Sequence, residues 1–217
     1  MPTHHPPHQG QPVLTAGAPL AQAKAAMILV HGRGASAADI LTLVPQLQQP
    51  DWAYLAPQAA GNTWYPYSFL APIAQNEPGI SSGLTAVSDL LALISAANIL
   101  PERIILLGFS QGACLALEFA ARHARRYGGV VGLSGGLIGP DDTPRDYGGS
   151  LAGTPVFLGC SDVDFHIPKA RVEESMVVLQ RLGGHVTMRL YPGMDHTIIQ
   201  DEILFVRQMM AEVGQHV

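Results

Sequence analysis

The sequence of 217 residues contains 47% hydrophobic and 13% charged residues, and its formal net charge at pH 7 is -5. Charged residues usually make up about a quarter of a globular domain, so this composition excludes an intrinsically disordered chain. The Lys and Arg residues are scattered apart from Arg122, Arg125 and Arg126. The sequence therefore lacks the basic patch on which nucleic-acid binding depends.

The length fits one large α/β domain with a sizeable core. We expect this single domain to span residues 12–217, after a flexible or edge-lying segment, residues 1–11, that is rich in Pro, His and Gln. The segment contains His4, His5 and His8 without a Cys or a carboxylate among them, so we expect no metal site there.

Neither secretion nor membrane insertion is indicated by the sequence. The N-terminal residues lack a positively charged stretch followed by a continuous apolar run, and no run approaches the roughly 18 apolar residues of a membrane span. The two cysteines, Cys114 and Cys160, lie in apolar runs, which indicates buried free thiols. We expect a cytoplasmic protein.

Short apolar runs alternate with segments of helical periodicity along the chain. The expected strands are AAMILV (25–30), WAYLA (52–56), RIILLGF (103–109), GGVVGLS (128–134), TPVFLGC (154–160) and VTMRLY (186–191). The expected helices are SAADILTLVPQL (36–47), SSGLTAVSDLLALISAANI (81–99), QGACLALEFAARHA (111–124), PKARVEESMVVLQRLG (168–183) and TIIQDEILFVRQMMAEV (197–213). This alternation of nearly all-apolar strands with helices predicts an α/β fold, with a mostly parallel central sheet covered on both faces. Ligands should bind beyond the carboxyl ends of the strands.

The serine-hydrolase pattern G-x-S-x-G occurs three times, as GISSG (79–83), GFSQG (108–112) and GLSGG (132–136). The pattern has a mechanical meaning only where the serine occupies a sharp turn between a strand and a helix. GISSG has no strand before it, and Ser81 or Ser82 is better interpreted as the N-cap of a helix that begins near Gly83. GLSGG is followed by turn residues, which leaves Ser134 as wall or loop near the site. GFSQG has both contexts, so Ser110 is the candidate nucleophile.

A serine hydroxyl needs a general base and an acid that orients the base, which in this fold follow in the order Ser, Asp or Glu, His. Among the histidines after Ser110, His196 lies beyond the end of an expected strand and just before the last helix, and His166 is the reserve candidate. Asp162 and Asp164 both follow the strand TPVFLGC, and the residues alone do not decide between them.

Acyl transfer also requires backbone N–H groups that stabilise the oxyanion. Gln111, directly after the nucleophile, is expected to supply one. The strand AAMILV is followed by HGRGAS, where Gly32 and Gly34 allow a tight turn that places the N–H of Arg33 toward the substrate carbonyl. Neither a metal nor an organic cofactor is required.

These motifs resemble the phospholipase/carboxylesterase family of α/β-hydrolases, which includes acyl-protein thioesterases and small bacterial carboxylesterases; dienelactone hydrolases are more distantly similar. The resemblance runs from about Met27 to the C-terminus and rests on LVHGRG, LLGFSQGA, VVGLSG, GCSDVDFHIP and YPGMDHT. It implies Asp164 as the acid, His196 as the base, Ser110 as the nucleophile, and the N–H groups of Arg33 and Gln111 as the oxyanion hole. Ser161 and Phe165 depart from the Gly and the frequent Pro of the family's acid segment.

The residues between GGVVGLS and TPVFLGC are too few and too rich in Gly for a cap domain, which predicts a shallow, open cleft. Its expected wall is the segment 61–79, in which Trp64, Tyr65 and Phe69 are candidate substrate contacts together with Ser134. The Arg33 side chain either points into the cleft and favours an anionic substrate or leaving group, or pairs with an acid such as Glu77.

The sequence thus predicts a serine carboxylesterase that acts on small-molecule esters through an acyl-enzyme. A thioesterase or lysophospholipase acting on lipidated substrates is the nearest alternative, and a noncatalytic ligand-binding protein of the same fold is the alternative of another class. The expected partner is a small-molecule ester, with no nucleic acid and no membrane insertion. The oligomeric state is left open, a homodimer included.

Overall fold

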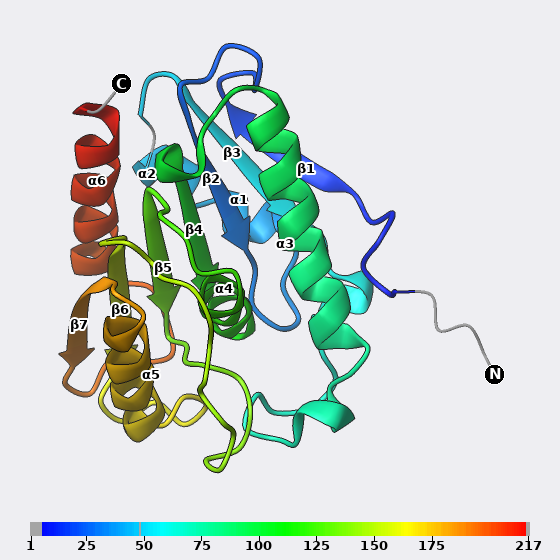
Figure 1. Cartoon of the computed structure of the whole chain (residues 1–217), viewed down its shortest axis with the longest axis vertical. Helices are drawn as coiled ribbons and strands as arrows, with labels where there is room; N and C mark the ends of the chain where they lie inside the picture. The colour runs from blue at the N-terminus through cyan, green and yellow to red at the C-terminus, as the bar shows by residue number, and fades with distance from the viewer. Residues whose placement is uncertain (1–5, 48, 216–217) are drawn as a thin grey trace.

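The computed structural model describes residues 6–47 and 49–215, which form a central sheet covered by helices on both faces (Figure 1). Seven strands pair in the order β1-β3-β2-β4-β5-β6-β7. They are β1 (Val13–Gly17), β2 (Ala25–Val30), β3 (Trp52–Pro57), β4 (Ile104–Phe109), β5 (Gly129–Leu133), β6 (Pro155–Ser161) and β7 (His185–Tyr191). Every neighbouring pair is parallel except β1 with β3, which is antiparallel. The predicted mostly parallel sheet is confirmed.

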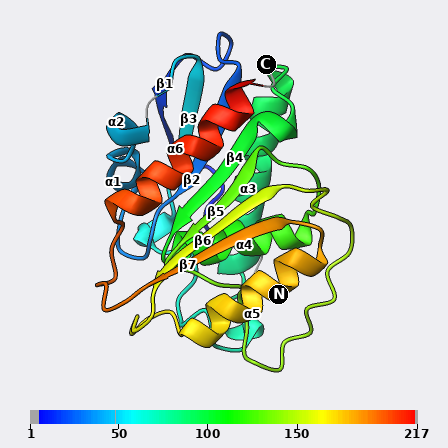
Figure 2. The same cartoon turned by 90° about the vertical axis from the view of Figure 1, so that its left-hand side faces the viewer.

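The helices divide into two layers (Figure 2). The helices are α1 (Ala37–Leu41), α2 (Val44–Leu47), α3 (Gly79–Ala96), α4 (Gln111–Arg122), α5 (Lys169–Arg181) and α6 (Gln200–Gln215). Alternate residues of β2 show why both layers are apolar: Ala26 and Ile28 belong to the core beneath α3, α4 and α5, whereas Met27 belongs to the core beneath α1, α2 and α6. All six residues of β2 are buried, as a strand covered on both faces requires.

The structure differs from the predicted elements at three places. The edge strand β1 was not predicted, because VLTAG is short and mostly exposed and so carries no buried apolar run. The expected helix 36–47 is two short helices. The helix predicted to begin near Gly83 begins at Gly79, so Ser81 and Ser82 lie inside its first turn and the N-cap prediction is wrong. Ser81 instead donates its N–H and hydroxyl to the Glu77 carboxylate, at 3.0 and 2.8 Å.

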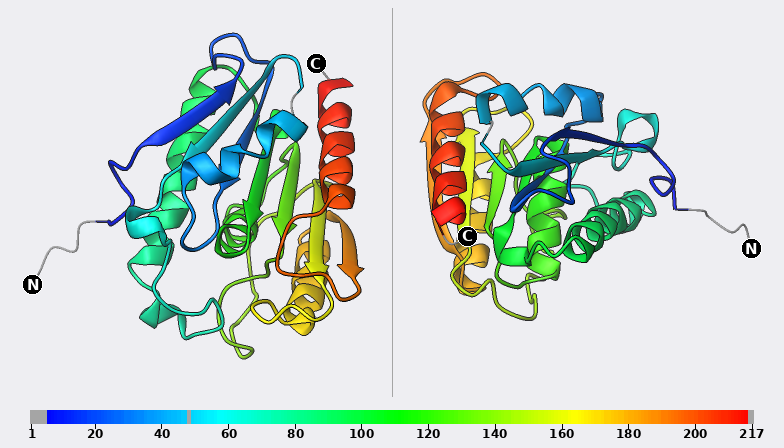
Figure 3. Two further views of the ribbon diagram at one scale, coloured as in Figure 1. Left: turned by 180° about the vertical axis from the view of Figure 1, so that it is seen from behind. Right: turned by 90° about the horizontal axis from the view of Figure 1, so that it is seen from above.

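Helix α3 is long and apolar enough, by length and composition, to cross a membrane. Half of it is buried, against α4 and the strands β2 and β3. Seen from behind and from above, the helix lies along one face of the sheet, as a core helix does (Figure 3).

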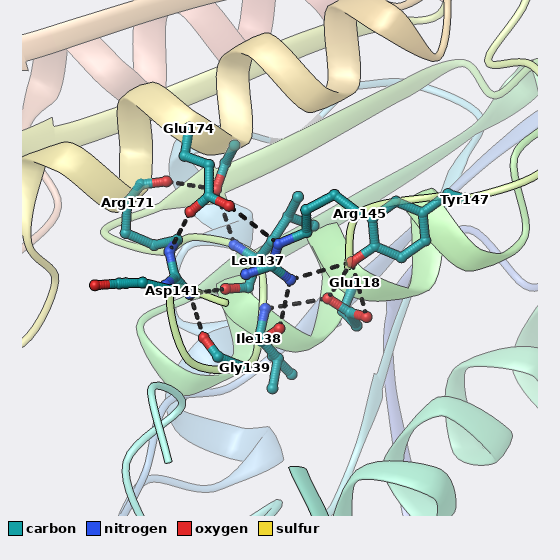
Figure 4. A network of polar contacts seen from close by, with 10 residues as sticks. Glu118, Leu137, Ile138, Gly139, Asp141, Arg145, Tyr147, Arg171 and Glu174 are labelled. Carbon is teal, nitrogen blue, oxygen red and sulfur yellow. Dashed lines mark hydrogen bonds and ion pairs between the residues drawn. The ribbon is translucent and has the colours of Figure 1, made fainter. Parts of the chain in front are cut away.

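No helix occurs in residues 134–154, the connection between β5 and β6, so no cap domain covers this end of the sheet. A polar network holds this connection in place instead (Figure 4). The Glu118 carboxylate, buried on α4, accepts the N–H of Ile138 at 3.0 Å and the hydroxyl of Tyr147 at 3.1 Å. The Glu118 carboxylate also forms an ion pair with Arg122, at 2.7 Å. A buried carboxylate is thereby fully engaged by the loop and by its own helix.

Arg171 on α5 holds the same connection from the other side. Its guanidinium donates to the carbonyls of Leu137 and Gly139, at 2.9 and 2.5 Å, and pairs with Asp141 and Glu174, both at 2.6 Å. The N–H of Gly139 in turn donates to the carbonyl of Phe69 at 2.7 Å. The connection 134–154 is therefore attached to α4 and α5 and also to the segment 64–69.

Candidate active site

The turn at Ser110 joins β4 to α4 at the carboxyl end of the sheet, toward which β2, β4 and β5 point in Figure 1. Ser110 has φ 54° and ψ -120°, a conformation that L-residues seldom adopt and that projects the side chain from a sharp turn. The two flanking glycines permit this turn. A Cβ on Gly112 would lie 2.1 Å from the carbonyl oxygen of Val30, and one on Gly108 would lie 2.2 Å from that of Gly112. The glycines of GFSQG thus allow close backbone approach.

Three side chains from three different loops form one hydrogen-bonded chain at this turn. His196 Nε2 lies 2.8 Å from Ser110 Oγ, and His196 Nδ1 lies 2.7 Å from Asp164 Oδ2. A carboxylate only accepts hydrogen bonds, so the imidazole proton lies on Nδ1 and Nε2 is free to accept the serine proton. Ser134, in contrast, is buried after β5 and does not line the cleft, and Ser81 lies on α3.

Asp164 is fixed by contacts on both of its oxygens. While Oδ2 faces His196, Oδ1 accepts the N–H groups of His166 and Ile167, at 2.8 and 3.0 Å. Burial raises the pKa of Asp164, but the hydrogen bond with His196 and the two backbone donors outweigh burial and hold the pKa below its usual value. Asp162, the other candidate, accepts the N–H of Gly193 at 2.8 Å and so braces the loop that carries His196. The geometry favours Asp164 as the partner of the imidazole.

His166, the reserve candidate for the base, lies beside the imidazole rather than in the hydrogen-bonded chain. Its ring meets that of His196 edge-on with centroids 4.9 Å apart, and it is exposed at the rim of the cleft. The Phe109 ring also lies near the imidazole, with its centroid 5.1 Å from that of the His196 ring. The imidazole of His196 therefore contacts two neighbouring rings.

The two backbone N–H groups expected to bind an oxyanion belong to residues that line the cleft next to Ser110. Gln111 is the first residue of α4, where the N–H has no carbonyl partner within the helix. Arg33 follows Gly32 in the turn after β2, and no described residue accepts its N–H. Both donors are thus available to a ligand, and the helix N-terminus adds a favourable dipole.

The cleft has a volume of about 390 Å³, near the lower end of ligand sites. Its lining consists of Arg33, Tyr65, Pro66, Tyr67, Ser68, Phe69, Ser110, Gln111, Cys114, His166, Ile167 and His196. Of the predicted wall residues, Tyr65 and Phe69 line the cleft. Trp64 does not: its side chain is buried and donates through Nε1 to the carbonyl of His31 at 2.9 Å. Trp64 thus supports the wall from beneath.

The Gln111 side chain has a role that the sequence analysis did not identify. Its Oε1 accepts the N–H of Trp64 at 2.9 Å, and its Nε2 donates to the carbonyl of Tyr65 at 2.8 Å. Gln111 is buried, so this paired contact locks the wall to the first turn of the nucleophile helix. The only sequence signal is a polar residue at the start of a helix whose next six residues are apolar or Gly.

Two neutral histidines support the same wall. His8 Nε2 lies 2.8 Å from the Trp64 carbonyl and its Nδ1 accepts the N–H of Ala60, while His31 Nδ1 lies 2.8 Å from the Gly32 carbonyl and its Nε2 accepts the N–H of Ala59. The segment at residues 6–11 therefore packs on the domain through His8, whereas His4 and His5 lie outside the described residues. Neither ring can gain a proton without losing an accepted hydrogen bond.

The free energy of unfolding is expected to fall as the pH drops below about 6.5. Burial lowers the pKa of His8 and of His31 from the ordinary value of 6.5, so the unfolded chain takes up protons that the folded chain does not. Each histidine contributes a slope of at most about 1.4 kcal/mol per pH unit, down to its folded pKa. Urea unfolding from about pH 8 to about pH 5, compared between the wild type and His8→Gln, measures the share of His8.

The comparison with His8→Gln is needed because another buried group acts in the opposite direction. Burial raises the pKa of Glu202 to about 7, so its protonated form stabilises the folded state as the pH falls. That contribution is present in both proteins and cancels in their difference. His185→Gln, at an exposed position on β7, is the matched control. A slope that is the same in the wild type and in His8→Gln would contradict the prediction.

The two cysteines are buried free thiols, as predicted, and burial raises the pKa of each to about 12. Cys114 lines the cleft, one turn after Ser110 on α4. A thiol of such high pKa is a poor nucleophile near neutral pH. Among the described residues no cluster of three or more His, Cys, Asp or Glu side chains could hold a metal ion.

The chain is similar to known proteins over most of its length. The family model for phospholipase/carboxylesterase matches residues 16–213. A crystal structure of a phospholipase/carboxylesterase from Dyadobacter fermentans is 44% identical, covers 93% of this chain and 97% of its own, and superposes with a TM-score of 0.90. Acyl-protein thioesterase 1 of Yarrowia lipolytica is 24% identical over 87% of this chain and 91% of its own.

A second thioesterase shares a shorter region with the chain. Acyl-protein thioesterase 1 of Gibberella zeae is 33% identical over 49% of this chain, and the match spans 46% of that protein's length. The family match, in contrast, extends from the edge strand β1 into the last helix. The chain therefore belongs to the phospholipase/carboxylesterase family, a group of ester-hydrolysing enzymes with the α/β-hydrolase fold.

Proposed function

We propose that the protein is a serine carboxylesterase that hydrolyses small to medium carboxylic esters through an acyl-enzyme. The observation that carries the proposal is the hydrogen-bonded chain from Ser110 Oγ to His196 Nε2, at 2.8 Å, and from His196 Nδ1 to Asp164 Oδ2, at 2.7 Å. These contacts match the requirements of a nucleophile, a general base and a group that orients the base.

In the first half of the reaction Ser110 Oγ attacks the ester carbonyl carbon while His196 Nε2 takes the hydroxyl proton. The C=O π electrons move to the carbonyl oxygen, and the N–H groups of Arg33 and Gln111 stabilise the negative charge there. Collapse of the tetrahedral intermediate breaks the bond to the alcohol oxygen, which takes the proton from His196. Asp164 stays ionised throughout and stabilises the transient imidazolium, in keeping with its lowered pKa.

In the second half a water molecule replaces the alcohol. His196 removes its proton as the oxygen attacks the acyl carbon, and the same two N–H groups bind the second oxyanion. Collapse releases the carboxylic acid and returns the proton to Ser110. No step needs an oxidant, a metal or an organic cofactor, because the nucleophile, the base and the electrostatic stabilisation all come from the chain.

The size of the cleft favours small acyl groups. A volume of about 390 Å³ accommodates a compact ester, whereas a long acyl chain would extend beyond the residues that line the cleft. Thioesters are the alternative substrate class, because two relatives are named acyl-protein thioesterase. The same nucleophile and oxyanion donors can serve the cleavage of an oxygen ester or of a thioester. Rates on an acyl-chain series of matched oxygen esters and thioesters would separate the two substrate classes.

A cytoplasmic location remains a prediction from the sequence.

The proposal is tested by treating the protein with a fluorophosphonate, which phosphonylates an activated serine with loss of fluoride, and mapping the modified peptide by mass spectrometry. We expect modification of Ser110 in the wild type and its loss in His196→Ala, because the hydroxyl is a weak nucleophile without its base. The same reagent applied to His166→Ala tests the neighbouring ring. Labelling that survives in His196→Ala but disappears in His166→Ala would assign the base to His166. Labelling of Ser81 or Ser134 would contradict the choice of nucleophile.

A further inference from the structure

The side chain of Arg33 carries a permanent positive charge at the cleft. Its guanidinium donates to two backbone carbonyls, those of Pro66 at 2.8 Å and Tyr67 at 2.5 Å, and its Cζ lies 5.9 Å from the centre of the Tyr65 ring. The acid named in the sequence analysis as an alternative partner, Glu77, is bound to Ser81 instead. Among the described residues no carboxylate lies within ion-pairing distance of Arg33.

Two carbonyl contacts leave most of the guanidinium unused. An arginine side chain has five N–H donors, arranged in a planar fork that matches a carboxylate. Carbonyl oxygens orient the group but bring no negative charge to balance it. Arg33 is thus a positioned cation with donors to spare, a few atoms away from the N–H that we assign to the oxyanion hole.

The rest of the cleft reinforces this charge. None of its lining residues is an Asp or a Glu, although the protein as a whole has a net charge of -5. The one carboxylate that belongs to the site, Asp164, is buried behind His196 and does not line the cleft. Two further cleft residues, His166 and His196, are neutral or positive and never negative. Apart from the two histidines, Arg33 is therefore the one charged side chain among the described residues that line the cleft, and no carboxylate there opposes it.

We infer that the cleft selects esters that carry a carboxylate, with Arg33 as the residue that recognises the anion. This inference rests on the proposed esterase function and names its substrate class. The carboxylate belongs either to the acyl group, as in a half-ester of a dicarboxylic acid, or to the alcohol that leaves. Both place the same anionic group within reach of the same guanidinium, and two substrate pairs distinguish them.

The first pair places the charge on the acyl side: the mono(4-nitrophenyl) ester of adipic acid and its methyl ester, which has no charge. The second pair places the charge on the leaving group: 4-acetoxybenzoate and methyl 4-acetoxybenzoate. For each pair the measured quantity is the ratio of kcat/KM for the charged ester to that for the neutral ester. A general change in catalysis, including a small shift of the backbone at Arg33, cancels in this ratio.

In Arg33→Gln we expect the ratio to fall about tenfold for one of the two pairs, because the charge is lost while an amide donor remains. In Arg33→Lys the ratio should stay within about threefold of the wild type, because a positive charge returns without the planar fork. The wild-type ratio should also decline as NaCl is raised from about 10 mM to about 1 M, and the ratio of Arg33→Gln should not.

A ratio that is the same in the wild type and in Arg33→Gln for both pairs would overturn the inference and leave Arg33 as a structural clasp on Pro66 and Tyr67. That outcome is distinct from failure of the proposed function. If the protein is not a serine esterase, neither member of either pair is hydrolysed. If it is an esterase without anion selectivity, both members of each pair are hydrolysed, and the ratio of their kcat/KM values is the same in the wild type and in Arg33→Gln.

Discussion

Replacing Ser110 with alanine is expected to lower kcat for a 4-nitrophenyl ester by about 10⁴-fold or more, because removal of the nucleophile abolishes the acyl-enzyme route and leaves only the binding and oxyanion contributions. The fold should tolerate the change. We expect alanine to keep the φ of 54° that the turn imposes on Ser110, and among the described residues the Oγ hydrogen-bonds only to His196. Steady-state kinetics measure the effect, and circular dichroism and thermal unfolding check that the variant is folded.

The chain supplies two matched controls, since each of the other G-x-S-x-G matches has its own serine. Ser134→Ala changes a buried residue that does not line the cleft, and Ser81→Ala changes a residue of α3 that contacts Glu77. Both should retain kcat within about tenfold of the wild type. A Ser110→Ala protein that keeps more than about one part in 10³ of the activity would rule out the proposed nucleophile.

Replacing Asp164 with asparagine is expected to lower kcat by about 10⁴-fold, the second large effect. An amide can donate to Nδ1 and thereby favour the tautomer that carries its proton on Nε2, which cannot accept the proton of Ser110. The substitution is nearly isosteric, so Oδ1 can continue to accept the N–H groups of His166 and Ile167. The loss should appear in kcat rather than in KM, and the pH dependence of kcat should change in the same variant.

Asp162→Asn is the matched control, because Asp162 is two residues away in the same loop. Its carboxylate accepts one backbone N–H, that of Gly193, and an amide oxygen can replace it. We expect a loss of less than about tenfold. Should Asp162→Asn prove as inactive as Asp164→Asn, the loop as a whole would be responsible, and the assignment of the orienting acid to Asp164 would not stand.

Strands β2 to β6 could be predicted from the sequence because they are largely buried on both faces, whereas the half-buried edge strand β7 was predicted from the apolar residues of VTMRLY. Each of the six apolar runs coincides with an observed strand to within one or two residues at either end, from AAMILV at β2 to VTMRLY at β7. The edge strand β1 escaped prediction because it is short and its side chains are largely exposed. Burial provided the signal for the five inner strands.

Ser110 and His196 could be predicted as candidate site residues from their order in the chain and from their places just after the ends of strands. The residues alone did not decide between Asp162 and Asp164, because both follow the same strand and their directions depend on the neighbouring loop that carries His196. Only the family resemblance pointed to Asp164. The wall was harder still. The Gln111 side chain bonds Trp64 and Tyr65, which are separated from it by 47 and 46 positions in the sequence. The Trp64 side chain points inward rather than toward the cleft. Contacts of such separation have no local pattern.

The polar network around Glu118 holds the wall of the cleft in place in the absence of a ligand. The wall residue Phe69 is hydrogen-bonded to Gly139, whose loop is attached to α4 through Glu118 and to α5 through Arg171. The same helix α4 begins at Gln111, which holds the other part of the wall at Tyr65. One rigid helix therefore braces the wall at two points before any ligand arrives. Ester binding should cost little conformational entropy in this wall, so discrimination among substrates depends on fit and charge rather than on loop closure.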